Sequence, residues 1–389
     1  MHAGKQRVLV VATGMKDLGG GTLVTANAVE ALKQDFDVSL LAWEPFDLAT
    51  INRTFGTKLS AKDFKLLTSP AFLRLFEKIN PYFSAFRSGI ILRMAKKMRK
   101  DFDVLFSLHN EADFGCRGLQ YIHDPPYYLS LSSRPSPRLV IPNQMWALFK
   151  GRQRPWMIVA GYSHERMMTN VTLVNSHWTQ NQLRGIYGIE SRVVSPPVAG
   201  NFLDVPWENR ENGFVCIGRF SPVKELEKVC RIITMVRKQI PDVHLHMVGT
   251  SWKRGYVKTL LRQISDSPWI TMHQDVSRRE LLHLISTHRY GIHGMVNESF
   301  GLAVAEMMKG GCIVFVPRSG GPSEVVGADE RTLYDSEGDA TSKIIAVLKD
   351  PEMQNSIRRF LEGRRDLYSQ ESFFGQIQEV VRQFPRQAV

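Results

Sequence analysis

Hydrophobic positions follow two alternating patterns along the chain. Short apolar runs of strand type, such as residues 7–13, 104–108 and 213–218, are followed by longer segments in which apolar residues recur at helical spacing. The alternation extends over 389 residues, of which 43% are hydrophobic, so the chain is long enough for two domains with separate cores. Alternating strands and helices favour parallel sheets covered on both faces. The pattern therefore predicts an α/β protein of two domains.

The boundary between the two domains is expected within residues 195–212. This stretch contains Pro196, Pro197, Gly200 and Pro206 and few periodic apolar positions, as linkers do. The expected domains are residues 1–195 and 196–371, followed by a helical segment within residues 372–389.

The segment ESFGLAVAE, residues 298–306, lies where a strand-type run turns into a helix. Amides at a helix start have no intrahelical partner and favour an anion, which here suits a diphosphate on residues Ser299, Phe300, Gly301 and Leu302. Glu298 precedes the helix and Glu306 lies about a turn and a half into it. The two carboxylates are therefore expected to hold two ends of one elongated ligand, a sugar and a ribose. The alternative is an ordinary helix with a charged start.

Two cations lie at a second junction of this kind. Residues 213–218 form a buried-type strand run, and Arg219 and Lys224 follow it before the next helical segment. Cations are unfavourable near a helix N-terminus unless an anion is present. A guanidinium fork and an ammonium group suit the two phosphates of a nucleoside diphosphate, with solvated surface charge as the alternative.

Together these motifs resemble the retaining family 4 glycosyltransferases, which use nucleoside-diphosphate sugars. The resemblance rests on IGRFSPVKELEKV (217–229), MVGT (247–250) and NESFGLAVAEMMKGGCIVFVPRSGGPSEVV (297–326), and it extends more loosely to residues 173–198. It implies the GT-B fold, in which two Rossmann-like domains with parallel sheets face each other across a cleft. It also implies that the C-terminal helix within residues 372–389 crosses back to the first domain.

The resemblance assigns roles residue by residue. Glu298 would contact the donor sugar, Glu306 would accept hydrogen bonds from the ribose hydroxyls, and residues 299–302 would offer amides to the diphosphate. The chemistry implied is front-face attack with retention, in which the departing diphosphate helps to take the acceptor's proton. Arg219 and Lys224 would stabilise the charge that develops on this leaving group.

No cofactor and no metal is then required. Two DFD strings, residues 35–37 and 101–103, invite the opposite interpretation, because paired carboxylates can hold a divalent ion on phosphates. Both strings occur as DFDV directly ahead of a predicted strand. They are therefore interpreted as helix-to-strand turns rather than as metal ligands.

In the N-terminal domain, Gly20 and Gly21 lie in a glycine run that follows the first strand-type run and opens a helix. Glycines let a ligand approach the backbone closely, and the resemblance places these two beside the donor; a loose turn without a ligand is the alternative. His123 follows a short apolar run of strand type and precedes Asp124-Pro125-Pro126, which end regular structure. It is therefore expected at the carboxyl end of a strand, where ligands bind in open α/β sheets. The resemblance makes His123 the sugar-contacting, catalytic histidine, with His109 on the acceptor side.

The donor and acceptor are predicted only from a short resemblance. Residues 121–126, YIHDPP, resemble the corresponding segment of mannosyltransferases that build lipid-linked oligosaccharides. This favours mannose from a GDP-linked donor and a glycan or lipid-linked acceptor. The alternatives are a UDP-linked donor of glucose or N-acetylglucosamine, a sugar-nucleotide epimerase, and a non-catalytic subunit that binds a nucleotide sugar.

The formal charge is +12 and the pI is near 9.6, and part of this charge lies in residues 86–100, which contain no acidic residue. Ile90, Met94 and Met98 share one helical face, and basic residues cover the others. Such a helix is expected either to lie on an anionic membrane or to pack on the sheet with a solvated basic side. Basic and aromatic residues within 71–76 and 145–156 add to the same character. Nucleic acid is not expected as a partner, because no motif supports it.

The compartment is predicted from the cysteines and the apolar segments. Cys116, Cys216, Cys230 and Cys312 show no CxxC spacing and are expected to be free thiols in a reducing compartment. Neither a signal-peptide core nor an apolar stretch of membrane-spanning length is apparent. The protein is therefore expected to be cytoplasmic, with possible peripheral contact at the cytosolic membrane face.

Overall fold

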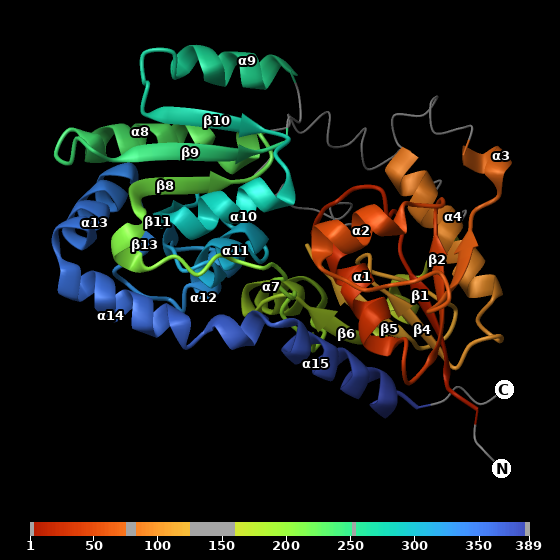
Figure 1. The fold of residues 1–389 in the computed structure, drawn as a ribbon. Helices are drawn as coiled ribbons and strands as arrows, with labels where there is room; N and C mark the ends of the chain where they lie inside the picture. The colour runs from red at the N-terminus through yellow and green to blue at the C-terminus, as the bar shows by residue number, and fades with distance from the viewer. Residues whose placement is uncertain (1–3, 75–82, 125–159, 251–253, 386–389) are drawn as a thin grey trace. The chain divides into compact units, whose positions relative to one another are not determined.

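The computed structural model describes residues 4–74, 83–124, 160–250 and 254–385, which form two compact units (Figure 1). Unit 1 comprises Met1–Pro197 together with Gln370–Val389, and unit 2 comprises Val198–Ser369. Each unit contains one sheet whose strand pairs are parallel. The α/β fold class predicted from the alternating hydrophobic pattern is confirmed.

Unit 1 alternates strands and helices as follows: β1 (Arg7–Val11), α1 (Gly20–Leu32), β2 (Asp37–Ala42), α2 (Leu48–Phe55), β3 (Lys65–Thr68), α3 (Ala71–Arg74), α4 (Phe83–Lys97), β4 (Val104–Ser107), β5 (Leu119–Ile122), α6 (His164–Met168), β6 (Val171–Val174), α7 (His177–Tyr187), β7 (Arg192–Val193) and, from the chain's end, α15 (Gln370–Gln383). The sheet order is β3-β2-β1-β4-β5-β6-β7. The order reverses direction beside β1, so the carboxyl ends of β1 and β4 flank a topological switch point.

Helix α15 returns to unit 1 and packs along α1 (Figure 1). Its Gln370 and Gln378 side chains donate to Asn27 Oδ1 at 2.7 Å and to the Ala31 carbonyl at 2.6 Å. Phe373 and Ile377 on the same helix are fully buried. Burial of these apolar side chains holds the C-terminal segment in unit 1, and the polar contacts set its register.

Helix α4 carries most of the basic segment of residues 86–100, and the apolar side of this segment packs inside unit 1. Ile90, Met94 and Met98 contact a buried cluster that includes Leu9, Leu41 and Leu105 of the sheet. Lys96 also forms an ion pair with the buried Asp113, at 2.9 Å. The apolar face is therefore a core face, and an anionic surface could meet only the exposed basic side of this segment, which includes Arg93 and Lys97 on the helix and Lys100 just after it. Residues 145–156 lie outside the described residues.

The two DFDV strings precede strands, as the turn interpretation predicts. Asp37 begins β2, and Asp103 directly precedes β4 and accepts a hydrogen bond from the Arg7 amide at 2.8 Å. Asp35 forms an ion pair with Arg382 of α15. Because both strings lie where strands begin, they occupy the edge of the sheet opposite to the carboxyl edge.

Unit 2 repeats the alternation in these elements: β8 (Glu211–Ile217), α8 (Leu226–Arg237), β9 (His244–Gly249), α9 (Arg254–Gln263), β10 (Ile270–Gln274), α10 (Arg278–Thr287), β11 (His288–Ile292), α11 (Leu302–Lys309), β12 (Ile313–Pro317), α12 (Gly321–Val325), β13 (Leu333–Tyr334), α13 (Glu337–Lys349) and α14 (Pro351–Glu362). Short 3-10 turns lie at Trp207–Asn209 (η2), Pro222–Lys224 (η3) and Arg365–Tyr368 (η4). The sheet order is β10-β9-β8-β11-β12-β13, which reverses direction beside β8.

The core of unit 2 buries the apolar side chains of its strands and helices together. Side chains of β8, β9, β11 and β12 join those of α8, α11 and α13 in one buried cluster. Helix starts are marked by local capping: Ser336 accepts from the Asp339 amide before α13, and Asp350 with Pro351 opens α14. All four cysteines are free, and Cys216, Cys230 and Cys312 are buried in this unit. Among the described residues, no helix is both long and apolar enough to cross a membrane.

Candidate functional site

The candidate site of unit 2 lies at the switch point of its sheet. Consecutive strands are added on one side of β8 up to β10 and on the other side from β11 onward, so the strand order reverses between β8 and β11. The loops that follow these two strands carry the residues that the sequence singles out. Lys224 lies in the turn η3 after β8, and Glu298 lies in the loop between β11 and α11. In open α/β sheets, ligands bind at this position, beyond the carboxyl ends of the strands.

A cluster of three charged or titratable side chains is formed there by Lys224, Glu298 and His293. Lys224 Nζ donates to Glu298 Oε1 at 2.8 Å, and His293 Nε2 lies 2.6 Å from Glu298 Oε2. The three side chains are 15%, 20% and 2% exposed. Glu298 is the only acidic residue of the three. Its two neighbours therefore favour the charged form of its carboxylate.

The electrostatics of Glu298 result from two opposing causes. Burial alone raises the pKa of this carboxyl, whereas His293 and Lys224 beside it lower that pKa more strongly. The net result is a pKa well below the usual range of a glutamate. At neutral pH Glu298 is therefore an acceptor only, suited to sugar hydroxyls, and Lys224 has further N–H donors to offer to an anion.

Close backbone packing fixes the loop that carries Glu298. Gly301, the residue before α11, has a positive φ of 92°, and Gly320 has the same value. A Cβ on Gly320 would lie 2.6 Å from the Glu298 carbonyl oxygen, and that carbonyl accepts the Gly321 amide at 2.8 Å. Side chains at either glycine would push the loop away, so the glycines of NESFG and SGGP place Glu298 over the sheet edge.

Glu306 has a different partner. Its Oε1 lies 2.5 Å from Arg278 Nη1, and Arg278 Nη2 also donates to the Ala199 carbonyl at 2.7 Å. The Glu306 side chain is 15% exposed. The two glutamates of the motif are therefore held by separate cations, as expected if they serve two separate parts of one ligand.

Arg219 and the start of α11 complete the residues predicted in unit 2. Arg219 is exposed directly after β8, and its guanidinium has no partner among the residues that the structure describes. Residues 299–302 lie at the N-terminus of α11, where Gly301 is the N-cap residue and no side chain caps the helix. Phe300 is buried against Tyr368, so it contributes its backbone rather than its ring.

The switch point of unit 1 carries histidines and a glycine loop. Gly20 and Gly21 open α1 after β1, and a Cβ added to Gly21 would lie 4.0 Å from His123 Nε2. His123 follows β5, and its Nε2 lies 3.0 Å from the Leu108 carbonyl. A carbonyl only accepts, so Nε2 is assigned the proton and Nδ1 keeps a lone pair. Burial lowers the pKa of His123 to about 4, so the ring is neutral at pH 7.

Two further polar groups lie at the same edge. His109 follows β4, and burial, together with the nearby His123 and Arg87, lowers its pKa to about 3. Thr13 follows β1, and its buried Oγ1 has no hydrogen-bond partner among the described residues. A buried hydroxyl without a partner is costly, so a ligand hydroxyl or a water molecule is the natural group to fill this position.

Sequence reasoning missed two of these residues. His293 follows the buried strand β11 directly, and the strand-end argument applied to His109 and His123 would also have found it. Arg278 begins α10, 28 residues before its partner Glu306, and carries no local signal. Its role appears only when the fold brings the two helices together.

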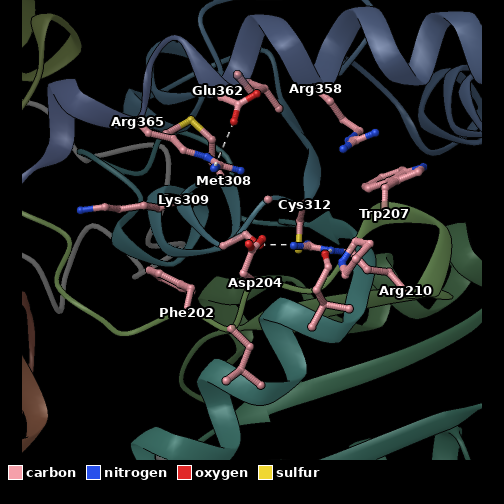
Figure 2. A pocket seen from close by; sticks show the side chains of 16 residues that line it. Phe202, Asp204, Trp207, Arg210, Met308, Lys309, Cys312, Arg358, Glu362 and Arg365 are labelled. Atoms are coloured by element: carbon pink, nitrogen blue, oxygen red, sulfur yellow. Dashed lines mark hydrogen bonds and ion pairs between the residues drawn. The ribbon is translucent and has the colours of Figure 1, made fainter.

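A separate pocket of about 360 Å³ lies elsewhere in unit 2 (Figure 2). It is lined by residues 202–207 and 308–312 and by side chains of α14 and η4, near the points where β8 and β12 begin. Arg210 in its wall donates to the carbonyls of Val205 and Gly310 at 3.0 and 2.9 Å. The pocket contains none of the residues that the sequence predicts for the site, and it lies at the opposite end of the strands.

The chain is similar to curated mannosyltransferases. It is 28% identical over 216 residues to the GDP-Man:Man(3)GlcNAc(2)-PP-Dol alpha-1,2-mannosyltransferase of Candida glabrata, a match that covers 50% of this chain and 43% of that protein. The human protein of the same name is 25% identical over 229 residues, covering 53% of this chain and 46% of the relative. Each match thus spans less than half the length of the relative.

The fold is similar to solved structures over nearly its whole length. Anabaena HepE in complex with UDP and glucose has a TM-score of 0.68 at 15% identity, with 97% of this chain and 99% of that chain covered. WaaG, a glycosyltransferase involved in lipopolysaccharide biosynthesis, also has a TM-score of 0.68, at 11% identity and with 96% and 99% covered. At these identities the likeness shows the fold, which is GT-B, as expected from the motifs.

The family model that matches covers the part of the chain that holds the charged cluster. Residues 202–362 match the glycosyl transferases group 1, a range that includes Arg219, Lys224, Glu298 and Glu306. The family expected from IGRFSPVKELEKV and NESFGLAVAE is thereby confirmed. Residues 202–362 therefore match the group 1 glycosyl transferases, and the whole chain, with its two parallel-sheet units, has the GT-B fold.

Proposed function

We propose that this protein is a retaining mannosyltransferase that moves mannose from GDP-mannose to a lipid-linked glycan without a metal ion. The observation that carries the proposal is the Lys224–Glu298–His293 cluster at the switch point of unit 2. The names of the similar mannosyltransferases support the choice of donor and acceptor. The nucleoside-diphosphate sugar is then a substrate, and no cofactor takes part.

The cluster and the groups beside it suit a nucleotide sugar in three ways. Glu298 stays ionised and can accept hydrogen bonds from sugar hydroxyls. Lys224 can turn further donors to a phosphate while it keeps its contact with Glu298. Arg219 and the uncapped start of α11 add a cation and helix amides for the diphosphate. These groups would stabilise the leaving diphosphate more strongly in the transition state than in the bound donor, which is how they would accelerate transfer.

Unit 1 would supply the groups that contact uncharged hydroxyls. Neutral His123 offers a lone pair at Nδ1 to a sugar hydroxyl, and Gly20 and Gly21 leave the backbone open beside it. None of these groups is a strong base, because the pKa of His123 is about 4. The acceptor's proton would therefore pass to the departing diphosphate in a front-face reaction, with retention at the anomeric carbon.

A lipid-linked acceptor would bring the protein to a membrane surface. The exposed side of α4 carries basic residues, whereas its apolar side is used in the core of unit 1. Contact with an anionic membrane would therefore be electrostatic and peripheral, without insertion of this helix.

The first test is thermal unfolding with GDP, UDP, ADP and their sugar conjugates, each with magnesium and with EDTA. A ligand at a hundred times its Kd stabilises the folded state by about 2.7 kcal/mol, so the preferred nucleotide is easily recognised. Stabilisation by GDP and GDP-mannose in EDTA supports the proposal. A preference for UDP conjugates would contradict mannose as the transferred sugar and favour the UDP-linked alternative.

Turnover needs a second test. GDP-mannose and a short lipid-linked glycan are incubated with the enzyme, and the new linkage is analysed by NMR. An α-linked product supports retaining transfer. Nucleotide binding without any product would indicate a non-catalytic subunit, and a converted donor without transfer would indicate an epimerase.

A further inference from the structure

Four histidines and a glutamate gather on one face of the sheet of unit 2. His244 and His246 are two residues apart on β9, so their side chains point to the same face. Glu211 begins β8 and His288 begins β11, and these two residues are paired in register. His273 lies on the neighbouring strand β10. None of these side chains belongs to the cluster around Glu298.

A glycine makes this gathering possible. Gly213 of β8 is paired with His244, and β8 lies between β9 and β11 in the sheet. A Cβ on Gly213 would lie 2.2 Å from His244 Nε2, which no side chain could accommodate. The bare backbone of β8 therefore lets the His244 imidazole reach across this strand, and its Nε2 lies 3.2 Å from Nε2 of His288.

The ligand atoms have the spacing that a transition metal requires. One nitrogen each of His244, His246 and His288 lie within 4.8 Å of one another. Two nitrogens that are each about 2.0–2.1 Å from a tetrahedral zinc ion lie roughly 3.3 Å apart, close to the spacing of His244 and His288. Glu211 Oε2 lies 3.3 Å from His244 Nε2 and 3.9 Å from His288 Nε2, where a fourth ligand would be needed.

The outer contacts of the imidazoles favour this interpretation. His288 Nδ1 lies 2.8 Å from the Leu284 carbonyl, so Nδ1 carries the proton and Nε2 keeps a lone pair toward His244. Metal-bound histidines typically donate their second ring N–H in this way. His246 Nδ1 lies 2.6 Å from His273 Nε2, which gives His246 the same kind of support.

We infer that His244, His246, His288 and Glu211 form a binding site for a divalent transition metal, with zinc as the best match. Three imidazoles and a carboxylate are ligands that zinc accepts, and softer thiolate ligands are absent from the cluster. His244, His288 and Glu211 each begin their strand, whereas the candidate donor site lies beyond the carboxyl ends. The metal would clamp β8, β9 and β11 together and would not take part in sugar transfer. The inference does not depend on the proposed function.

Cobalt provides the direct test, because four-coordinate cobalt has characteristic visible absorption bands. The full-length protein is stripped with a chelator, exchanged into chelator-free buffer and titrated with cobalt and then with zinc. We expect bands that saturate at one equivalent and disappear when zinc displaces cobalt, together with a rise in Tm. Titration without four-coordinate bands would overturn the inference and would leave a metal-free histidine network.

Three variants locate the site. His246→Asn and Glu211→Gln remove one ligand each and should weaken metal binding at least roughly 10–100-fold, because loss of even an outer-shell partner has that effect. Glu211 is exposed, so its variant is expected to fold even if the variant at His246 does not. His177→Asn, on helix α7 of unit 1, is the matched control and should bind cobalt as the wild type does. Equal affinity in all three variants would place the metal elsewhere and refute the assignment.

Discussion

The carboxyl edges of the two units have the same topology but different chemistry. In each sheet the strand order reverses beside the first strand of the unit, between β1 and β4 and between β8 and β11. At the edge of unit 2 the side chains are charged and already paired, as in Lys224 with Glu298 and Arg278 with Glu306. At the edge of unit 1 the groups include two neutral imidazoles, a threonine hydroxyl and a glycine loop, and a cation, the Arg87 guanidinium, lies near His109.

Under the proposed function, this difference would separate two tasks within one fold. A partly buried charge is tolerable only with a partner, so the pairs in unit 2 keep cations in place before a charged ligand arrives. A hydroxyl-bearing ligand needs only directed acceptors and donors, which neutral histidines supply. Under the proposed function, paired charges would therefore be concentrated at the edge of unit 2, where the diphosphate departs, and the hydroxyl groups at the edge of unit 1 would meet mainly neutral side chains. Substitutions at the edge of unit 2 should therefore change transfer and donor binding, whereas a substitution at the edge of unit 1 should change the pH dependence of stability.

The largest effect is expected for Lys224→Ala. Removing a preorganised donor from a developing negative charge typically lowers kcat about 10²–10³-fold, or roughly 2.7–4 kcal/mol. It also leaves Glu298 with His293 as its remaining partner, so some loss of stability should accompany the loss of transfer. The measurement is steady-state kinetics with the donor and acceptor that the unfolding screen identifies.

The matched control is Lys228→Ala. Lys228 lies one turn further along the chain and pairs with Glu225 at 2.9 Å, and its side chain is about as buried as that of Lys224. This variant should lose stability to a similar degree and retain transfer. A wild-type rate in Lys224→Ala, or an equal loss in both variants, would contradict the phosphate role of Lys224.

Glu306→Gln is expected to weaken donor binding. The amide keeps the shape but removes the charge that would accept ribose hydroxyls, at a cost of about 1.5–3 kcal/mol, or roughly 10–150-fold in Kd. The measurement is calorimetric titration with the preferred nucleotide and with its 2′,3′-dideoxy analogue.

The two ligands separate a binding role from a structural one. If Glu306 receives the ribose, wild type and variant should bind the dideoxy nucleotide with similar affinity. If Glu306 only holds Arg278, the variant should lose thermal stability while its affinity for both nucleotides stays unchanged.

The local motifs allowed much of unit 2 to be predicted, and the reasons are physical. The loop that holds Glu298 is set by glycines and by a helix start, which are short-range features visible in NESFGLAVAE. The partners of the two glutamates are long-range: Lys224 lies 74 residues from Glu298, and Arg278 meets Glu306 only through the packing of α10 and α11. The histidine cluster was missed because its members lie on four strands and are joined by the absence of a side chain at Gly213.

The basic segment of residues 86–100 shows a different limit. The helical spacing of Ile90, Met94 and Met98 is the same for a core face and for a membrane face. Only the packing of these side chains against the sheet of unit 1 separates the two interpretations. A single amphipathic pattern therefore predicts the helix but not what covers it.

A smaller effect is expected for the pH dependence of stability in unit 1. The pKa of His123 is about 4 in the folded state against an ordinary 6.5, so the unfolded state binds more protons between these values. The stability that this residue contributes is present above pH 6.5 and is lost as the pH falls toward 4. Between pH 7 and pH 5 the loss is about 2 kcal/mol, from 1.36 kcal/mol per pH unit.

Urea unfolding of the wild type and of His123→Asn at both pH values measures this term. The variant should lose about 2 kcal/mol less than the wild type on acidification, whereas His177→Asn should behave as the wild type does. Equal acid sensitivity in wild type and His123→Asn would mean that His123 is not held neutral by its burial.

The smallest effect concerns the basic side of α4 and compares the two units in their contact with an anionic membrane. Lys97 is exposed on this helix, and Lys258 is exposed on α9 of unit 2. If a membrane meets unit 1, Lys97→Gln should weaken binding to vesicles rich in phosphatidylserine by about 1 kcal/mol, or roughly fivefold, and the difference should shrink at high salt. Lys258→Gln removes the same charge from the other unit and should leave binding unchanged. Because both variants lower the net charge equally, an equal loss in the two would indicate attraction by overall charge alone, and the basic side of α4 would then have no special role.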